Sequence, residues 1–419
     1  MTAGTPDAAR PTSLADADPA PRPPDVPADH LPADAFSPTR PRYGGGSLAD
    51  LLPSVSAVLG VPGTDDVLGL RDHLDGIRRI AVLLVDGLGA YQIPLIVPHA
   101  PVLADLAAGN GGRAATLTSG FPSTTPVSLA TLGTGALPGA HGILGFTVRR
   151  PDGRILNHIR WSDDPDPRQW QPVPTRLEGA AAAGVAVTTV TRPEFEGSGL
   201  TVSAMRGGAF SGAVDSSAVA DQMLRAVSAA DGPALVYGYH PDLDQRGHET
   251  GVDSDAWQGA ARGVDRLLDR LVTGLPTGTA LLVTADHGQV NVPYDRRFDI
   301  GADPALSAGV AAVSGEPRVR YLYPVDGALD DVLAAYRSVL GDAAWVITRD
   351  EAIDGGWYGP VPPSHAGRIG DVVVICLGRT VVLATGWEPP AVAALIAYHG
   401  SVTAAEMTVP LLSFVRPPG

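Results

Sequence analysis

Five short patches place acidic, imidazole or hydroxyl side chains at points where apolar runs of the sequence end. Each patch alone is a weak signal, because a single Asp or Thr in such a place commonly closes a turn or caps a helix. Together they supply three carboxylates, three imidazoles and a hydroxyl, which are enough to hold two divalent metal ions around a nucleophile. That set suits in-line attack on a phosphoryl group. The patches are residues 84–87, 123–126, 244–248, 285–288 and 399–401.

The hydroxyl that we expect to act as the nucleophile is Thr125. Pro126 fits the first position of a helix, so Thr125 would be the helix N-cap. A capping threonine needs no further role, but the same geometry points its hydroxyl and free backbone N–H groups outward, where they can bind an anion. A metal ion would lower the pKa of that hydroxyl. Thr124 is the rival candidate.

The carboxylates follow apolar runs that are typical of strands buried on both faces. Asp86 closes the run 80–85, and Asp286, next to His287, closes the run 280–285. A third run, 234–239, precedes a loop in which Asp244 and His248 are four residues apart, so a helical turn would bring them to one face. Asp242 competes with Asp244 for this role.

Helical patterns alternate with these runs, at residues 218–229 and 254–271, after a short helix expected at 47–59. Strands that alternate with helices predict an α/β fold with a doubly wound, mostly parallel sheet flanked by helices. Ligands of such sheets bind at the carboxyl ends of the strands, where the three aspartates lie. Further elements are expected at 319–323, 329–340, 371–376 and 409–414.

Three segments depart from this alternation of strands and helices. Residues 1–45 are rich in Pro, Ala and Asp and predict a disordered tail, so the catalytic domain would be 46–419. Residues 146–213 look irregular or β-rich, and part of them is expected to form a small inserted cap over the site. Residues 291–314 are a second irregular zone.

Composition excludes several classes of function. The net charge of −15 argues against a nucleic acid polymer or an anionic membrane as partner. All basic residues are Arg, which excludes lysine Schiff-base chemistry and a phosphate-binding loop lysine. No apolar stretch approaches the roughly 20 residues of a membrane span, and no signal peptide is recognisable. The single cysteine, Cys376, lies in an apolar run and is expected to be buried and inert. We therefore expect a cytoplasmic protein.

The order of these motifs resembles the alkaline phosphatase superfamily, and specifically its type I phosphodiesterase/nucleotide pyrophosphatase branch. The segment T-G-x-x-P-x-x-H-G-I at 134–143, which follows the nucleophile, is the most specific part, and the resemblance covers about 80–414. It implies an alkaline phosphatase-like fold and two divalent metal ions. Zinc is the expected metal, with manganese or iron as alternatives. It also implies a small phosphorylated substrate such as a nucleotide.

The resemblance also implies how the metal ligands are divided. One metal would be held by the strand-end Asp, the nucleophilic Thr and the Asp-His pair, and the other by the D-x-x-x-H pair and a late histidine. His399 is the favoured late ligand and His365 the alternative. Carried over, the two sets are Asp86, Thr125, Asp286 and His287, and Asp244, His248 and His399.

One departure from the family pattern affects the substrate. Relatives that cleave nucleotides often carry an Asn shortly after the H-G-I segment, where this chain has Phe146. Arg160 or Arg206 would then have to bind the phosphoryl oxygens. We therefore expect a phosphodiesterase that acts through a covalent threonyl-phosphate-type intermediate. The alternatives are a phosphomonoesterase or C–P hydrolase on the same scaffold, and a non-catalytic metal-binding relative. A sulfatase would need a modifiable Cys or Ser nucleophile, which is missing here. The sequence does not indicate an oligomeric state.

Overall fold

A seven-stranded sheet forms the centre of the molecule. The structure is a computed structural model and describes residues 26–28 and 30–418. The strand order is β2-β17-β8-β1-β7-β5-β6, and β17 alone runs antiparallel to its neighbours. The predicted doubly wound, mostly parallel sheet is therefore confirmed. The strands are β1 (Arg79–Val85), β2 (Ala114–Thr118), β5 (Ala186–Thr191), β6 (Ala209–Gly212), β7 (Ala234–His240), β8 (Thr279–Thr284) and β17 (Thr408–Arg416).

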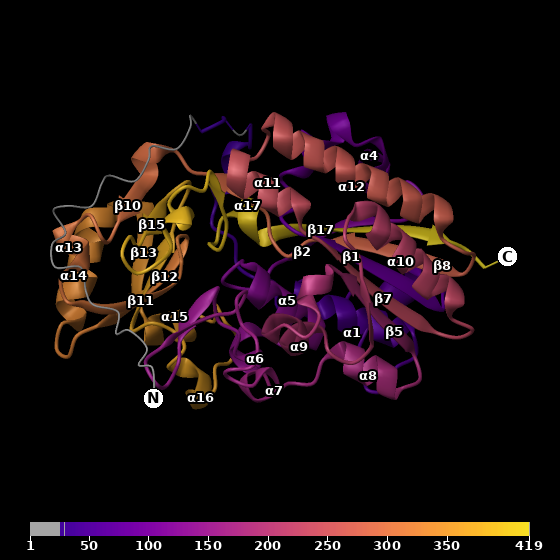
Figure 1. Cartoon of the computed structure of the whole chain (residues 1–419), viewed down its shortest axis with the longest axis horizontal. Helices are drawn as coiled ribbons and strands as arrows, with labels where there is room; N and C mark the ends of the chain where they lie inside the picture. Colours follow the sequence, from indigo (N-terminus) through magenta and orange to yellow (C-terminus); the bar gives the residue numbers. More distant parts are fainter. Residues whose placement is uncertain (1–25, 29, 419) are drawn as a thin grey trace, which may run out of the picture.

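Helices cover both faces of this sheet, which explains why its central strands are apolar along their whole length (Figure 1). On β1 and β8 almost every residue is buried. The helices on one face pack against one another and against β7, whereas those on the other face gather around the helix that begins at Thr125. The first group is α4 (Pro101–Ala107), α10 (Ser216–Ala229), α11 (Asp242–Thr250) and α12 (Asp255–Gly274); the second is α1 (Leu48–Val58), α5 (Thr125–Thr134), α8 (Arg176–Ala182) and α9 (Gly199–Met205).

A second, smaller sheet lies beside the main one and is drawn in orange and yellow at the left of Figure 1. Its strand order is β11-β12-β14-β13, and neighbouring strands are antiparallel. Two helices pack on its outer side around Leu322 and Val374. Its elements are β11 (Val310–Glu316), β12 (Val319–Pro324), β13 (Ala344–Thr348), β14 (Val372–Cys376), α13 (Pro304–Ser307) and α14 (Leu329–Leu340).

Shorter elements connect the two sheets. The hairpin of β3 and β4 packs against β11, where the Thr147 hydroxyl donates to the Gly315 carbonyl at 2.8 Å. Cys376 ends β14 and is fully buried, as predicted. The remaining helices and strands are α2 (Leu70–His73), α3 (Ile93–Ile96), β3 (Thr147–Arg149), β4 (Ile155–Asn157), α6 (Pro138–His141), α7 (Pro167–Trp170), β9 (Val290–Asn291), β10 (Arg297–Asp299), α15 (Arg349–Asp354), α16 (Pro363–Ala366), β15 (Val381–Leu383), β16 (Ala397–Tyr398) and α17 (Ala404–Met407).

The predicted cap differs from the structure in its boundaries. Residues 146–213 contain β5 and β6, which are strands of the main sheet, so only the part around the β3–β4 hairpin lies outside that sheet as a strand pair of its own. Among the described residues, the largest sheet apart from the main one is formed by 310–376, which begins within the second irregular zone, 291–314. Strand β5, at 186–191, has three Thr among its six residues and no continuous apolar run, and this composition hid it among irregular residues.

The predicted disordered tail is also too long at its C-terminal end. Its first part, 1–25, lies outside the described residues. Residues 33–36 form a 3-10 helix in which Ala35 is fully buried, packed in a cluster with Val290 and Tyr398. Further along, the Arg42 guanidinium donates to the Thr116 carbonyl at 2.6 Å. The packed chain therefore begins before residue 46.

A buried ion pair ties the smaller sheet to the segment that follows His399. Arg318, in the turn between β11 and β12, donates from Nε and Nη2 to the Glu406 carboxylate at 2.9 and 2.5 Å, and both side chains are fully buried. The same carboxylate accepts from the Ser401 backbone N–H at 3.0 Å and the Thr403 hydroxyl at 2.5 Å. Removing one partner of such a pair leaves an uncompensated buried charge. The loop at 399–401 thus depends on the smaller sheet for its position.

Two fully buried histidines lie between the main and smaller sheets. His158 Nδ1 lies 2.8 Å from the Gly145 carbonyl, and its Nε2 accepts from the Trp170 indole N–H at 3.1 Å, so the ring fits only in its neutral form. Burial lowers the pKa of His158 to about 4 and that of His141 to about 3. The contacts of His141 are structural, because its Nε2 lies 3.0 Å from the Thr131 hydroxyl and its Nδ1 accepts from the Ile143 backbone N–H at 3.1 Å.

We expect the fold to lose stability as the pH falls from about 6.5 to 4. In that range the unfolded chain binds protons on His141 and His158 and the folded chain does not, so each histidine costs on the order of 1 kcal/mol of unfolding free energy per pH unit. Urea unfolding of the metal-loaded protein at several pH values measures this slope. His158→Gln should reduce the slope of the unfolding free energy against pH by the amount that corresponds to about one proton. His99→Gln, which is outside this pair, should leave the slope unchanged. An unchanged slope in His158→Gln would contradict the prediction.

None of the described helices is both long enough and apolar enough to cross a membrane. The longest, α12, covers the main sheet with Trp257, Val264 and Leu268 and exposes charged residues on its other side. This alternation is the ordinary pattern of a helix packed on a sheet.

Candidate active site

The carboxyl ends of two neighbouring parallel strands bring the first aspartates together. Leu84 of β1 lies opposite Thr284 of β8, so Asp86 and Asp286, each two residues further along, come side by side. The backbone N–H of Gly87 donates to Asp286 Oδ1 at 3.2 Å and fixes this arrangement. Both aspartates are buried, as the sequence predicted for residues at the ends of central strands.

His287 joins these carboxylates to the predicted nucleophile. Its Nε2 lies 3.5 Å from Asp86 Oδ1, 3.4 Å from Asp286 Oδ2 and 3.1 Å from the hydroxyl oxygen of Thr125. Asp86, Asp286 and His287 offer ligand atoms within 4.8 Å of one another, and all three are buried. Thr125 is 8% exposed, so its hydroxyl remains within reach of the adjoining cavity.

Asp244, His248 and His399 form a second group of the same kind. Helix α11 places Asp244 and His248 on one face, with His248 Nε2 3.4 Å from Asp244 Oδ2. His399, which follows β16, adds its Nε2 at 3.8 Å from Asp244 Oδ1. The rings of His287 and His399 are stacked with their centroids 3.5 Å apart, so the two groups are adjacent.

Gly87 lets the two groups approach each other. Its φ is +74°, and a Cβ at this position would lie 3.0 Å from Cα and Cβ of Asp244. A side chain here would strain the backbone and push Asp244 away from the site. Gly87 therefore lets α11 come close to the end of β1.

The N-terminus of α5 settles which threonine faces the cluster. Thr124, not Thr125, is the N-cap, and Thr125 is the first helical residue, followed by Pro126. The one-residue difference from the prediction arises because Pro126 is favourable at either of the first two helical positions. Thr125 points to His287, whereas the Thr124 hydroxyl is fully buried and faces the Glu316 carboxyl at the end of β11.

The three histidines hold their Nε2 atoms toward the cluster because their other ring nitrogens face backbone carbonyls. Nδ1 of His248 lies 2.8 Å from the Ala397 carbonyl, that of His399 3.1 Å from Ser123, and that of His287 3.2 Å from Gly288. A proton on Nδ1 donates to each carbonyl and leaves the Nε2 lone pair free, which is the tautomer of a metal-binding imidazole. Burial and the neighbouring rings of His287 and His248 lower the pKa of His399 well below its ordinary value, so its ring is neutral.

The carboxylates lack the positive charge that their burial requires. Asp86 Oδ1 and Asp286 Oδ2 are buried and have no hydrogen-bond partner among the described residues. Burial, reinforced by the charges of Asp286 and Asp244, raises the pKa of Asp86 well above its usual range, and burial also raises that of Asp286. Carboxylate oxygens beside neutral imidazoles, with no Arg at the cluster, are the donor set of a divalent metal site. The residues therefore fit metal ions.

Two residues that the sequence reasoning missed support the aspartates. The Tyr239 hydroxyl donates to Asp86 Oδ2, and the Gln289 side-chain amide donates to Asp244 Oδ1 and, at 3.1 Å, to the Asp244 backbone carbonyl. Both lie within three residues of a predicted ligand or strand end in the sequence. A polar residue in an otherwise apolar strand or strand end was the signal that could have found them.

The two rival side chains lie outside the cluster. Asp242 accepts from the Arg192 guanidinium at 2.8 Å and is half-exposed. His365, on α16, has its Nδ1 2.9 Å from the Gly139 carbonyl and packs beside Gly142. Neither contributes a ligand atom to the two groups.

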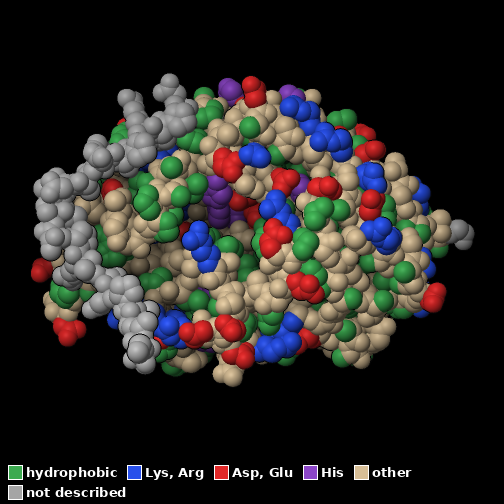
Figure 2. Space-filling view, viewed as in Figure 1, with side chains coloured by type: hydrophobic (Ala, Val, Ile, Leu, Met, Phe, Trp, Pro, Cys, Tyr) green, Lys and Arg blue, Asp and Glu red, His purple; other side chains and the backbone are tan. Residues whose placement is uncertain are grey.

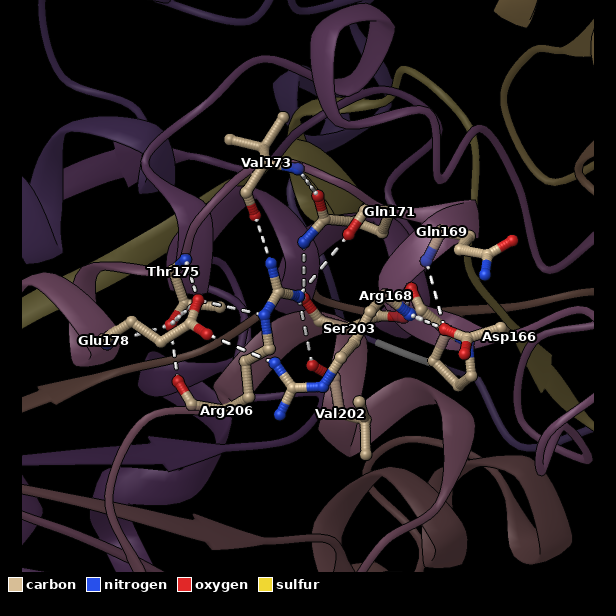
Figure 3. A network of polar contacts seen from close by, with 11 residues as sticks. Asp166, Arg168, Gln169, Gln171, Val173, Thr175, Glu178, Val202, Ser203 and Arg206 are labelled. Carbon is tan, nitrogen blue, oxygen red and sulfur yellow. Dashed lines mark hydrogen bonds and ion pairs between the residues drawn. The ribbon is translucent and has the colours of Figure 1, made fainter.

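Arg206 is not free to bind substrate. Figure 3 shows its guanidinium within a polar network in which it donates to backbone carbonyls of α9 and of the chain before α8, among them Val173 at 2.7 Å. Its Nε is also 2.9 Å from the Glu178 carboxylate. Arg206 therefore holds α9 against the start of α8, and this part of the substrate prediction is wrong. The neighbouring Arg168 makes a further ion pair with Glu178 at 3.3 Å.

Two cavities open on either side of the cluster. The first, of about 360 Å³, is lined by Thr125 and Asp86 and extends toward β5 and α9. The second, of about 350 Å³, runs toward the smaller sheet and includes Arg160. Phe146 lies on the wall of both cavities, as do His248 and His399. Figure 2 shows histidine side chains at the bottom of a hollow between the two parts of the molecule.

Comparison with known proteins identifies relatives of this arrangement. A family profile described as type I phosphodiesterase / nucleotide pyrophosphatase matches residues 80–401. A search of curated protein sequences found no match.

Solved structures with the same fold include two enzymes of different names. Murine ectonucleotide pyrophosphatase / phosphodiesterase 5, an inactive variant in complex with AMP, is 18% identical, with a TM-score of 0.64 over 81% of this chain and 88% of that one. Phosphonoacetate hydrolase from Sinorhizobium meliloti, in complex with phosphonoacetate, is 19% identical, with a TM-score of 0.62 over 80% of this chain and 90% of that one. At these identities the likeness concerns the fold.

Proposed function

Because the chain belongs to the type I phosphodiesterase / nucleotide pyrophosphatase family, we propose that it hydrolyses a phosphodiester or phosphoanhydride through Thr125, with two divalent metal ions at the site. The family and the fold place the chain among hydrolases of phosphoester or C–P bonds. The nucleophile, the metal ligands and the substrate class are the parts proposed here.

One observation carries the proposal. Six side chains with metal-binding atoms, distributed from residue 86 to residue 399, meet around the hydroxyl of Thr125. The buried oxygens of Asp86 and Asp286 and the Nε2 atoms of the three histidines all turn toward the same small volume. A non-catalytic scaffold protein has no need for a free hydroxyl at the centre of such a set, so we favour an enzyme.

The metal ligands follow from the two groups. Asp86, Asp286, His287 and Thr125 would hold one ion, and Asp244, His248 and His399 the other. Mixed carboxylate and imidazole ligands favour zinc, with manganese or iron as alternatives. When bound, such ions act as Lewis acids that stabilise negative charge on the transferring phosphoryl group.

The proposed hydrolysis then has two steps, and the residues around Thr125 support both. The Thr125 oxygen attacks phosphorus, forming a Thr–O–P bond while the bond from phosphorus to the leaving oxygen breaks. Water next forms a bond to phosphorus and releases the Thr125 oxygen, so the configuration at phosphorus is retained overall. The unpaired backbone N–H groups at the N-terminus of α5 lie beside the nucleophile and favour an anionic substrate there. Arg160, on the wall of the second cavity, remains a candidate for binding phosphoryl oxygens.

Hydrolysis of bis(p-nitrophenyl) phosphate tests this proposal. We expect the metal-loaded protein to release p-nitrophenolate from this diester at least about tenfold more efficiently, by kcat/KM, than from p-nitrophenyl phosphate. The reason is the lack of any Arg on the first cavity to neutralise the second charge of a monoester. Phosphonoacetate, assayed by release of inorganic phosphate, covers the C–P alternative. A preference for the monoester or for phosphonoacetate would overturn the diesterase proposal.

A further inference from the structure

The first cavity has an apolar wall that begins beside the nucleophile. Leu129 of α5 and Phe146 line it near Thr125, and Leu200 and Met205 of α9 line it further along. Phe195 closes another part of the wall and meets the Tyr239 ring edge-on, with the ring centroids 6.2 Å apart. Such a wall binds a group that gains by leaving water.

Three hydroxyl groups interrupt this apolar wall. Thr189 and Thr191 lie two residues apart on β5 and therefore point to the same face of the sheet. Tyr237 of β7 is opposite Thr189 in the strand register, so all three belong to one patch. All three line the cavity and are at least 96% buried, at 4%, 4% and 2% exposure.

None of these three hydroxyls has a hydrogen-bond partner among the described residues. The other four hydroxyls on the cavity wall differ, because each has a partner. Ser198 donates to Thr201 at 3.0 Å, Tyr239 donates to Asp86, and the Thr125 oxygen lies 3.1 Å from His287 Nε2. Buried polar groups in folded proteins are nearly always hydrogen-bonded. Three unpartnered hydroxyls in one patch of a cavity therefore indicate that the group which fills the cavity supplies their partners.

The charges around the cavity limit what that group can be. The charged side chains on its wall are Asp86 and Asp244, and no Arg is among the lining residues. Two nearby guanidinium groups are occupied, Arg192 by Asp242 and Arg206 by Glu178. In the proposed site the metal ions are offset by these carboxylates and by the reacting phosphoryl group, so an additional anionic group would find no counter-charge of its own, and the cavity is suited to an uncharged group.

We propose that Thr189, Thr191 and Tyr237 form a specificity subsite for one ester group of the substrate. This subsite takes an uncharged, mainly apolar group that carries at least one oxygen or nitrogen able to hydrogen-bond with the hydroxyls. The proposal rests on the proposed function, since it assigns the group attached to the phosphorus that Thr125 attacks. It places the selectivity of the enzyme on β5 and β7, away from the metal ligands.

Three matched diesters of p-nitrophenyl phosphate test the subsite, with phenyl, 3-(hydroxymethyl)phenyl or 3-carboxyphenyl as the second ester group. In wild-type protein we expect kcat/KM to be about tenfold higher for the hydroxymethyl diester than for the phenyl diester, and lowest for the carboxylate. In the double variant Thr189→Val, Thr191→Val, the hydroxymethyl preference should disappear through a higher KM, while kcat on the phenyl diester stays within about twofold.

Thr188→Val is the matched control, because Thr188 directly precedes Thr189 on β5, points to the opposite face and does not line the cavity. It should keep the wild-type preference. Tyr237→Phe provides a second route to the same loss of preference if the double variant does not fold. An active wild-type enzyme whose preference survives both sets of substitutions would overturn the subsite alone. Failure of wild-type protein to cleave any of the diesters would overturn the proposed function with it.

Discussion

Replacing Thr125 with alanine is expected to lower kcat for diester hydrolysis by about 10³-fold or more, since no other hydroxyl can take over the attack. The Thr125 oxygen is the hydroxyl that lies 3.1 Å from His287 Nε2 at the centre of the candidate metal ligands. Thr125→Ser keeps a hydroxyl at this place, now a primary one, and should retain measurable turnover. Steady-state release of p-nitrophenolate from bis(p-nitrophenyl) phosphate measures both.

Thr124→Val is the control for the rival nucleophile. Thr124 is fully buried, its hydroxyl faces the Glu316 carboxyl, and valine preserves its shape. This variant should keep kcat within about tenfold of wild type, the residual loss coming from the lost contact with Glu316. The opposite pattern, an active Thr125→Ala and an inactive Thr124→Val, would identify Thr124 as the nucleophile.

Removal of metal is expected to abolish activity, by at least about 100-fold, and to lower the melting temperature by several degrees. The physical reason is the cluster of Asp86, Asp244 and Asp286, whose mutual repulsion in a buried site disfavours the folded state unless a cation is bound. Metal present at about 1,000 times its Kd would stabilise the fold by about 4 kcal/mol. Dialysis against a chelator, followed by addition of Zn²⁺, Mn²⁺ or Fe²⁺, measures the loss and its recovery.

Metal analysis distinguishes the two candidates for the last ligand. Wild-type protein should bind two ions per chain, and His399→Ala should bring this toward one, since His399 Nε2 faces Asp244. His365→Gln is the matched control and should keep both ions, because its contact is with the Gly139 carbonyl. Full activity after exhaustive chelation would contradict the two-metal proposal. Loss of metal in His365→Gln but not in His399→Ala would identify His365, and not His399, as the last ligand.

The sequence predicted the main sheet well because its central strands carry an unambiguous pattern. Apolar runs such as 80–85 and 280–285 are buried on both faces, and Asp at the end of each run is costly to bury without a function. Since parallel strands end at one edge of a sheet, the convergence of Asp86 and Asp286 followed from the pattern alone. His399 is different. It comes from a distant loop, and only the resemblance to a known family pointed to it.

The parts that could not be predicted depend on contacts between distant segments. Strand β5 reads as irregular because three of its six residues are Thr, and two of them, Thr189 and Thr191, face a cavity that exists only in the folded protein. Arg206 looks like a substrate-binding residue by its charge, but Glu178 and backbone carbonyls engage it locally. The strands at 319–324 and 372–376 were expected, yet their sequence does not tell which sheet they join.

The position of β17 has a consequence for how the protein is made. This strand, at residues 408–416, lies inside the main sheet between β2 and β8, and its loop carries His399 only a few residues earlier. During synthesis on the ribosome, β1, β7 and β8 can pair before β17 has been made. Until then, the edges of β2 and β8 that will pair with β17 have no partner strand. Those edges would be open to chaperones and to neighbouring nascent chains until β17 itself has emerged.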